Sequence, residues 1–215
     1  MAPHGRIPEA TVARLPLYLR GLDAFPVGMT ATVSSDELAD LAGVNAAKVR
    51  KDLSHLGTYG TRGVGYDATF LRFQISQALG VANVWPVVVC GMGNLGRALA
   101  NHTGFTDRGF PVVAATDSDP DKIGTVVDGV PVHAPGELGD IVRRLGVAIG
   151  VISTPAEAAQ GTTDALVAAG VTSIMSFAPT VLSAPDEVEI RSVDLATELQ
   201  ILGFHLHRDR IAGDS

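Results

Sequence analysis

Several residue types are scarce in this chain of 215 residues. A single cysteine, Cys90, excludes an intrachain disulfide framework and a cysteine-rich metal site. Aromatic residues make up only 5%, so aliphatic side chains must form the core. No apolar run reaches the roughly 18 residues of a membrane-spanning helix, and residues 1–10 lack the apolar segment of a secretory signal. We therefore expect a cytoplasmic protein, and we expect no metal site.

Basic residues are outnumbered, with 16 Lys and Arg against 23 Asp and Glu and a formal net charge of −7. Such a balance normally repels nucleic acids. Residues 47–62 reverse it locally, because they hold four basic side chains and only one acidic side chain, Asp52. A nucleic-acid site is therefore expected in this N-terminal segment.

Residues 8–43 predict two helices. The first begins after Pro8 and is expected to kink or split at Pro16. Its apolar residues recur at helical spacing: Val12, Leu15, Leu19 and Leu22. The second begins at the capping box of Ser34 and Glu37 and ends at Gly43. Its expected buried face is Leu38, Leu41 and Ala42.

A third helix follows the Gly43 turn, which together with the second gives a helix-turn-helix. Asn45 is its expected cap, Gly57 its end, and Val49, Leu53 and Leu56 its buried stripe. Its outer face is basic and offers candidate contacts to phosphates and base edges. A charged helix face can equally be merely solvated. The candidate DNA-binding residues here are Asn45, Lys48, Arg50, Lys51 and His55.

The stretch 57–66 contains four glycines, two tyrosines and an arginine. This density of glycine suits a tight hairpin, and a hairpin directly after a helix-turn-helix is a wing. Tyr59, Thr61 and Arg62 are its candidate DNA contacts, with Arg62 placed to enter a minor groove. An ordinary surface hairpin is the alternative.

A dinucleotide-binding motif follows the apolar strand expected at 85–90. The sequence GMGNLG at 91–96 places G-x-G-x-x-G between a strand and a helix. Gly91 makes the tight turn, Gly93 lets the backbone approach a pyrophosphate, and Gly96 allows close packing of helix and strand. The candidate cofactor contacts in this loop are Gly91, Met92, Gly93, Asn94, Leu95 and Gly96.

The next strand, expected at 111–116, ends in Asp117, 21 residues after Gly96. A carboxylate at this place accepts hydrogen bonds from ribose hydroxyls and repels a 2′-phosphate, so NAD(H) is favoured over NADP(H). Asp119 competes for this role, and Lys122 could line the adenosine pocket. Asp117 could instead be only a turn residue.

Three further strands are expected at 147–152, 172–176 and 188–193, with a helix over 156–168. Helices between strands indicate a parallel sheet that binds ligands at its carboxyl ends. Thr154, Pro155 and Phe177 lie at such ends and are therefore candidate contacts near the nicotinamide. Thr154 could instead cap the helix, and Phe177 could only pack.

The chain ends in a helix with a leucine stripe at heptad-like spacing: Leu195, Leu199, Leu202 and Leu206. This stripe predicts dimerisation, although the helix could fold back on its own domain. The expected α/β architecture is thus a winged helix-turn-helix domain (1–80), a Rossmann dinucleotide-binding domain (81–191) and a C-terminal dimerisation helix (192–215).

Catalytic groups are missing from the pattern. No acid/base constellation accompanies the dinucleotide motif, and no residues remain for a substrate domain. We therefore predict that the chain is not an enzyme. An NAD-dependent oxidoreductase with an accessory winged helix stays as the alternative, and a regulator that binds a CoA derivative is a weaker third possibility.

Taken in order, these motifs resemble the Rex family of bacterial redox-sensing transcriptional repressors, from about Pro8 to His207. The matching segments are RLP at 14–16 with the later Arg20, VRKDL at 49–53, YGTRGVGY at 59–66, GMGNLG at 91–96, SFAP at 176–179 and VDLA at 193–196. The resemblance implies a homodimer that binds an inverted-repeat operator. It also implies that NADH displaces the protein from DNA, whereas NAD+ favours DNA binding.

The resemblance also implies a redox switch. The terminal helix is swapped between subunits in the family, and an acidic residue at the position of Asp194 can engage an arginine at the position of Arg20. A tyrosine commonly stands where this chain has His102, and some members have phenylalanine in place of Leu195. Because histidine changes charge with pH, we predict a cofactor response that varies between about pH 6 and 8.

Overall fold

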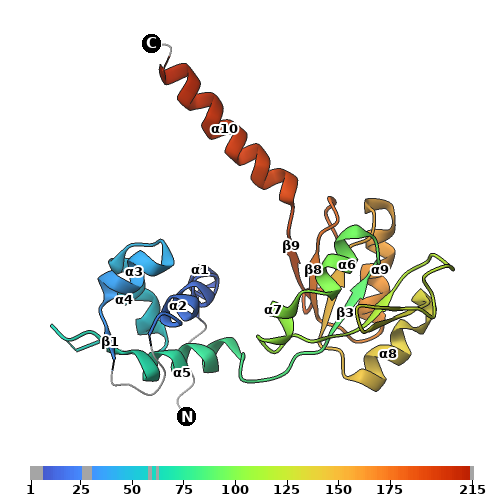
Figure 1. The fold of residues 1–215 in the computed structure, drawn as a ribbon, viewed down its shortest axis with the longest axis horizontal. Helices are drawn as coiled ribbons and strands as arrows, with labels where there is room; N and C mark the ends of the chain where they lie inside the picture. Colours follow the sequence, from blue (N-terminus) through green and yellow to red (C-terminus); the bar gives the residue numbers. More distant parts are fainter. Residues whose placement is uncertain (1–6, 26–30, 58–59, 62, 214–215) are drawn as a thin grey trace. The chain divides into compact units, whose positions relative to one another are not determined.

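The computed structural model describes residues 7–25, 31–57, 60–61 and 63–213. It divides the chain into two compact units, residues 1–83 and 84–215, each described here by itself. The first unit is the blue-to-teal part of Figure 1 and the second the green-to-red part.

The first unit is mainly helical. Its elements are α1 (Glu9–Val12), α2 (Leu15–Leu22), β1 (Thr32–Val33), α3 (Ser35–Ala42), α4 (Ala46–His55), β2 (Tyr66–Asp67) and α5 (Ala68–Leu79). The expected split of the first helix is confirmed, but it precedes Pro16, which occupies the first turn of α2. A proline there costs no helical hydrogen bond, so the helix breaks upstream of it.

The helix-turn-helix is built by local hydrogen bonds. Ser34 Oγ accepts the Glu37 N–H at 3.1 Å and Glu37 Oε2 accepts the Ser34 N–H at 2.8 Å, which confirms the capping box that begins α3. Gly43 ends α3 with a positive φ of 67°. Asn45 Oδ1 then accepts the Lys48 N–H at 2.9 Å and begins α4.

The core of the first unit lies between these helices. Val49 and Leu53 of α4 and Leu56, which directly follows it, are buried, as predicted. The prediction for Leu41 is wrong, because its side chain is 45% exposed and Ala39 is buried in its place. Leu41 points about 110° away from the mean direction of the buried α3 residues, since successive residues turn by about 100°.

A small sheet flanks the helices. β1 pairs antiparallel with β2, and Thr61 forms a separate bridge with Gly65. In the described part of the predicted wing, Thr61 and Gly65 exchange two backbone hydrogen bonds, and the strand that follows, β2, joins β1.

The second unit is an α/β fold. Its elements are β3 (Val87–Cys90), α6 (Asn94–Ala100), α7 (Thr103–Thr106), β4 (Val112–Thr116), β5 (Val126–Val127), β6 (Val130–His133), the 3-10 turn η1 (Pro135–Glu137), α8 (Leu138–Leu145), β7 (Ile149–Ile152), α9 (Ala156–Ala168), β8 (Ser173–Ser176), β9 (Glu189–Ser192) and α10 (Leu195–Gly213). The predicted helix 156–168 is found with the same bounds as α9.

One seven-stranded sheet has the order β5-β6-β4-β3-β7-β8-β9. All neighbours pair parallel except the edge pair β5–β6. From β6 to β9 this is the doubly wound order of dinucleotide-binding folds, which confirms the predicted fold class. Strand order reverses between β3 and β7, so their carboxyl ends open the crevice where such folds bind ligands.

The last helix, α10, is unusual in its exposure. Every described side chain from Leu195 to Arg208 is exposed, including the predicted leucine stripe at 58–69%. Among the described residues, no helix is long and apolar enough to cross a membrane.

Candidate nucleotide pocket and nucleic-acid interface

The glycine loop after β3 shows three different uses of glycine. Gly91 has φ +97°, and a Cβ there would lie 2.9 Å from the Ser153 carbonyl carbon. A Cβ at Gly96 would overlap the Gly91 carbonyl oxygen. A Cβ at Gly93 would meet nothing within 4 Å. Gly91 and Gly96 are therefore required by the fold itself, whereas Gly93 leaves open space in front of the loop.

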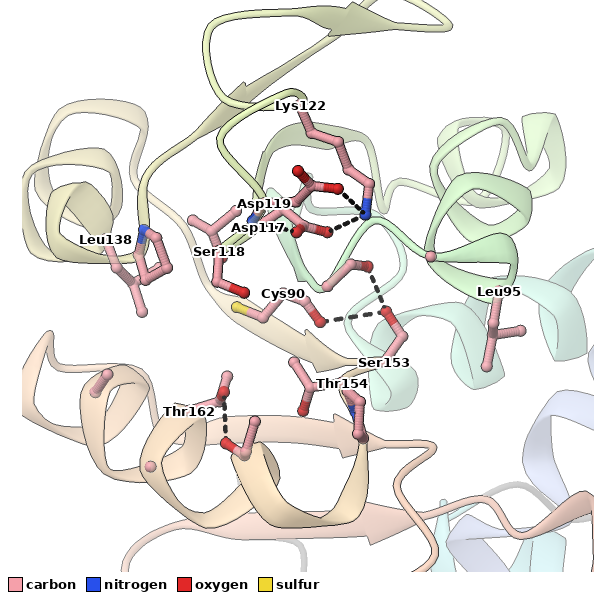
Figure 2. Close-up of a pocket in the computed structure, with 18 of the residues that line it drawn as sticks. Cys90, Leu95, Asp117, Ser118, Asp119, Lys122, Leu138, Ser153, Thr154 and Thr162 are labelled. Atoms are coloured by element: carbon pink, nitrogen blue, oxygen red, sulfur yellow. Dashed lines mark hydrogen bonds and ion pairs between the residues drawn. The ribbon is translucent and has the colours of Figure 1, made fainter.

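Asp117 joins this loop to the end of β4. Its Oδ2 accepts the Met92 N–H at 2.7 Å, and its Oδ1 accepts the Asp119 N–H at 2.8 Å. Lys122 Nζ lies 3.2 Å from Asp117 Oδ2 and 3.4 Å from Asp119 Oδ2, as Figure 2 shows. Burial alone would raise the pKa of Asp117, but these donors outweigh it and hold the pKa below its ordinary value.

A pocket of about 820 Å³ opens at this point. Eight predicted cofactor contacts line it: Gly91, Gly93, Leu95, Asp117, Lys122, Thr154, Pro155 and Phe177. Met92, Asn94 and Gly96 are not lining residues, and Met92 and Gly96 are buried beneath the loop.

The opposite wall of the pocket was missed by sequence reasoning. It comes from η1, α8 and α9, through Pro135, Leu138, Ala158, Gly161, Thr162 and Ala165 (Figure 2). These residues are small or apolar and carry no motif; only the crossover order of the sheet brings their helices to the same crevice.

Two helices begin at this pocket without a side-chain cap. The N-caps are Gly93 for α6 and Pro155 for α9, and neither offers a side-chain oxygen. Uncapped N–H groups and the positive end of a helix dipole suit an anionic ligand. Thr154 Oγ1 is a buried polar atom with no hydrogen-bond partner among the described residues. The pocket therefore fits a group with phosphates and additional polar atoms, such as a dinucleotide.

Cys90 also lines the pocket, at the end of β3. Its side chain is buried, and burial raises the pKa of the thiol to about 11. The thiolate is therefore scarce at neutral pH, which indicates a packing residue and not a redox-active one.

None of the three predicted switch residues is among those that line the pocket. His102 caps α7 by accepting the Gly104 N–H at 3.2 Å and stacks on Phe105 with ring centroids 4.6 Å apart. Asp194 caps α10, where its Oδ2 accepts the Thr197 hydroxyl at 2.9 Å; this bond and backbone N–H groups lower the pKa of Asp194. Arg20 is exposed on α2, in the first unit.

The outer face of α4 is cationic. Lys48, Arg50 and Lys51 are exposed, and Arg50 Nη1 donates to Ser35 Oγ of α3 at 2.8 Å. His55 is half-buried at the carboxyl end of α4, with no partner for Nε2 among the described residues. The structure thus presents three neighbouring cations on one helix.

Of the remaining predicted DNA contacts, Asn45 is exposed but its side-chain oxygen is used to cap α4. Thr61 is exposed in the turn at 61–65. Tyr59 and Arg62 lie outside the described residues.

One residue of α4 that sequence reasoning did not single out is Asp52, which is buried and bonded to Thr11, Arg14 and Tyr18. A charged residue at a position flanking the buried stripe of a helix was the available signal. Within the described part of the chain, no group of three or more His, Cys, Asp or Glu side chains could hold a metal ion.

Comparison with protein families agrees with the division of the chain into a helical first unit and an α/β second unit. Residues 6–54 match a family described as "Putative DNA-binding protein N-terminus", and residues 82–180 match one described as "CoA binding domain". The chain is 61% identical over 202 residues to the redox-sensing transcriptional repressor Rex of Streptomyces avermitilis, covering 94% of this chain and 80% of that protein.

Solved structures of a Rex-family repressor are also similar to this chain. The Rex-family repressor RSP, in complex with β-NAD+ and operator DNA, superposes with a TM-score of 0.89 at 32% identity, over 97% of this chain and 96% of that one. RSP in complex with β-NADH superposes with a TM-score of 0.84 at 31% identity, over 97% of this chain and 98% of that one. The chain belongs to the Rex family of redox-sensing transcriptional repressors.

Proposed function

We propose that this chain represses transcription by binding operator DNA through its first unit, and that NADH in the pocket of its second unit releases it. The observation that carries the proposal is the presence, in one chain, of a cationic helix-turn-helix face and a pocket with uncapped helix ends beside Asp117. Its similarity to RSP, which is known in complex with NADH, with NAD+ and with operator DNA, supports both halves.

The cofactor assignment follows from charge. Asp117 and Asp119 place two carboxylates beside Lys122, where a 2′-phosphate or the 3′-phosphate of CoA would be repelled. NAD(H) lacks both phosphates, and its pyrophosphate suits the ends of α6 and α9. The proposed contacts are Gly91, Met92, Gly93, Asn94, Leu95, Gly96, Asp117, Lys122, Thr154, Pro155 and Phe177.

The DNA contacts are proposed on α4 and the following turn. Lys48 and Lys51 are placed to reach base edges, and Arg50 is placed to reach a flanking phosphate. The full proposed set is Asn45, Lys48, Arg50, Lys51, His55, Tyr59, Thr61 and Arg62.

A homodimer is proposed as the active form, in the cytoplasm. The exposed leucines of α10 need an apolar partner, and a helix-turn-helix reader of an inverted repeat needs two-fold symmetry. We assign Arg20, His102 and Asp194 to the switch between cofactor and DNA, and we divide the chain into domains 1–80, 81–191 and 192–215.

No turnover is needed for this function. NADH must only bind the DNA-incompetent dimer more tightly than the competent one. Linkage then requires that operator DNA weaken NADH binding by the same factor. The repressor relatives favour this function over an NAD-dependent oxidoreductase.

The direct test is fluorescence anisotropy of a labelled inverted-repeat operator at fixed salt, because phosphate contacts make affinity depend strongly on salt. NADH should release the protein and NAD+ should not. Lys51→Ala should weaken operator binding with NADH affinity unchanged. If NADH leaves operator binding unchanged in every condition, the proposal is wrong.

A further inference from the structure

The buried carboxylate of Asp52 ties α4 to α1 and α2. Its Oδ1 accepts from Thr11 Oγ1 and from Arg14 Nη2, both at 2.8 Å. Its Oδ2 accepts from Arg14 Nε at 2.6 Å and from Tyr18 Oη at 2.7 Å. Asp52 is 1% exposed and is the only buried acidic residue among those described. Both oxygens are therefore fully used by donors from α1, α2 and the turn between them.

The other buried contacts of α4 are apolar and lack the directional geometry of hydrogen bonds. Val49, Leu53 and Leu56 pack into the apolar core of the first unit. Apolar packing depends on area removed from water and tolerates small rotations of a helix about its axis. A two-point bond between a guanidinium and a carboxylate has a fixed geometry. Among the buried contacts of α4, the Asp52 bonds are therefore the ones that define its rotation.

The position of Asp52 around α4 lets these bonds restrict rotation of the helix about its axis. At about 100° per residue, Asp52 lies about 40° from Lys48 and about 100° from Lys51 around the axis. It therefore sits at the margin of the buried face, next to the cationic face. A bond at this margin resists rotation in a way that a contact at the centre of the buried face does not.

We propose that Asp52 is a positioning residue for operator recognition: its bonds to Arg14 and Tyr18 hold α4 at the rotation that aims Lys48 and Lys51 at base edges. The inference rests on the proposed DNA-binding function and names a specificity determinant within it. Asp52 itself is enclosed and contacts no DNA.

This role predicts a particular defect. Contacts to phosphates tolerate angular error, since the attraction is electrostatic and depends little on direction. Contacts to base edges do not, because they depend on hydrogen-bond geometry. Loss of the Asp52 bonds should therefore weaken operator binding far more than binding to unrelated DNA.

The test compares Asp52→Asn with Leu71→Ala, which removes a fully buried side chain from α5 in the same core. Operator affinity and affinity for a scrambled duplex are measured by anisotropy at one salt concentration and at a temperature where circular dichroism shows both variants folded. We expect Asp52→Asn to lower the operator-to-scrambled ratio about tenfold or more, and Leu71→Ala to leave it unchanged. Tyr18→Phe removes one bond to Asp52 and keeps the ring, so it should lower the operator-to-scrambled ratio a few-fold. This variant replaces Asp52→Asn in the test if Asp52→Asn does not fold.

An unchanged ratio in Asp52→Asn, or an equal fall in Leu71→Ala, overturns the positioning role. If the wild-type protein itself does not distinguish operator from scrambled DNA, the proposed function fails first. NADH affinity, measured in parallel, should be the same in all variants.

Discussion

Asp52 in the first unit and Asp117 in the second both have a pKa below the ordinary value, in contrasting surroundings. Asp52 is enclosed and bonded only to protein side chains. Asp117 is partly exposed, bonds two backbone N–H groups and Lys122, and lines a pocket. A saturated, buried carboxylate has no acceptor left for a ligand, whereas a carboxylate at a pocket wall can offer one.

The helix ends of the two units differ in the same sense. In the first unit, Ser34, Asn45 and Asp67 cap α3, α4 and α5 with side-chain oxygens. In the second, α6 and α9 begin at the pocket without such caps. The helix-turn-helix thus satisfies the N-termini of its own helices and presents charge outward, whereas α6 and α9 leave N–H groups for a ligand to satisfy.

Among substitutions that test this contrast, the largest effect is expected from replacing Gly96. Gly96→Ala forces a methyl group into the Gly91 carbonyl oxygen, so the second unit should lose its fold and NADH binding together. Gly93→Ala meets no atom within 4 Å and should fold normally. It should nevertheless lose NADH affinity on the order of 100-fold, since its methyl group enters the pyrophosphate space. Thermal melting and NADH titration of both variants separate the two roles; a destabilised Gly93→Ala variant would contradict this assignment.

The next largest effect is on the stability of the first unit. Asp52→Asn should lower its free energy of unfolding by about 3 kcal/mol, because it leaves Arg14 without its charged partner. Asp117→Asn, in a partly exposed cluster, should cost the second unit about 1 kcal/mol or less. All three tyrosines lie in residues 1–83 and the single tryptophan, Trp85, lies in the second unit, so tyrosine and tryptophan fluorescence follow the two units separately.

Acid should amplify this difference. Burial alone would raise the pKa of Asp52, but the bonds from Arg14, Tyr18 and Thr11 lower it. A carboxyl group whose folded pKa is depressed contributes stability above its unfolded pKa of about 4 and loses it as the pH falls through the folded pKa. The first unit should therefore lose stability below about pH 5, and Asp52→Asn should flatten that loss. An equally steep loss in the variant would exclude Asp52 as its source.

A smaller effect is expected on cofactor choice. Asp117→Ala removes one of the two carboxylates beside Lys122 and leaves Asp119 as the other, so a phosphate is repelled less. NADH affinity should fall about tenfold, and the preference for NADH over NADPH should shrink by a similar factor. Titrations with both cofactors give the two numbers. Unaltered affinity for NADH would remove Asp117 from the site.

Much of this arrangement could be predicted from local sequence. Capping residues, turn glycines and the G-x-G-x-x-G motif act within a few residues of themselves, so Ser34, Gly43 and Gly91 were found from their neighbours alone. The parallel sheet could be predicted because helices alternate with apolar strands, but β5, β6 and α8 were not predicted. Leu41 was misplaced because α3 is short, and its buried direction is set by packing against another helix.

The contacts that the sequence did not reveal are long-range. Asp52 and Arg14 are 38 residues apart, and Asp117 and Met92 are 25 apart. No spacing rule connects Asp52 to Arg14. The spacing after the G-x-G-x-x-G motif associated Asp117 with the glycine loop, but it did not predict the bond from the Met92 N–H. The wall formed by α8 and α9 was missed because its residues have no chemical signature of their own.

The smallest expected effect concerns His102, where the family commonly has tyrosine. Nδ1 of His102 accepts the Gly104 N–H and begins α7. A tyrosine hydroxyl lies farther from the backbone and does not replace this short-range acceptor, so His102→Tyr should weaken the cap of α7 by about 1 kcal/mol. With His102 assigned to the switch, the factor by which NADH lowers operator affinity should change about fivefold in the variant. Anisotropy titrations with and without NADH measure this factor, and equal factors in the two proteins would mean that His102 takes no part in the switch.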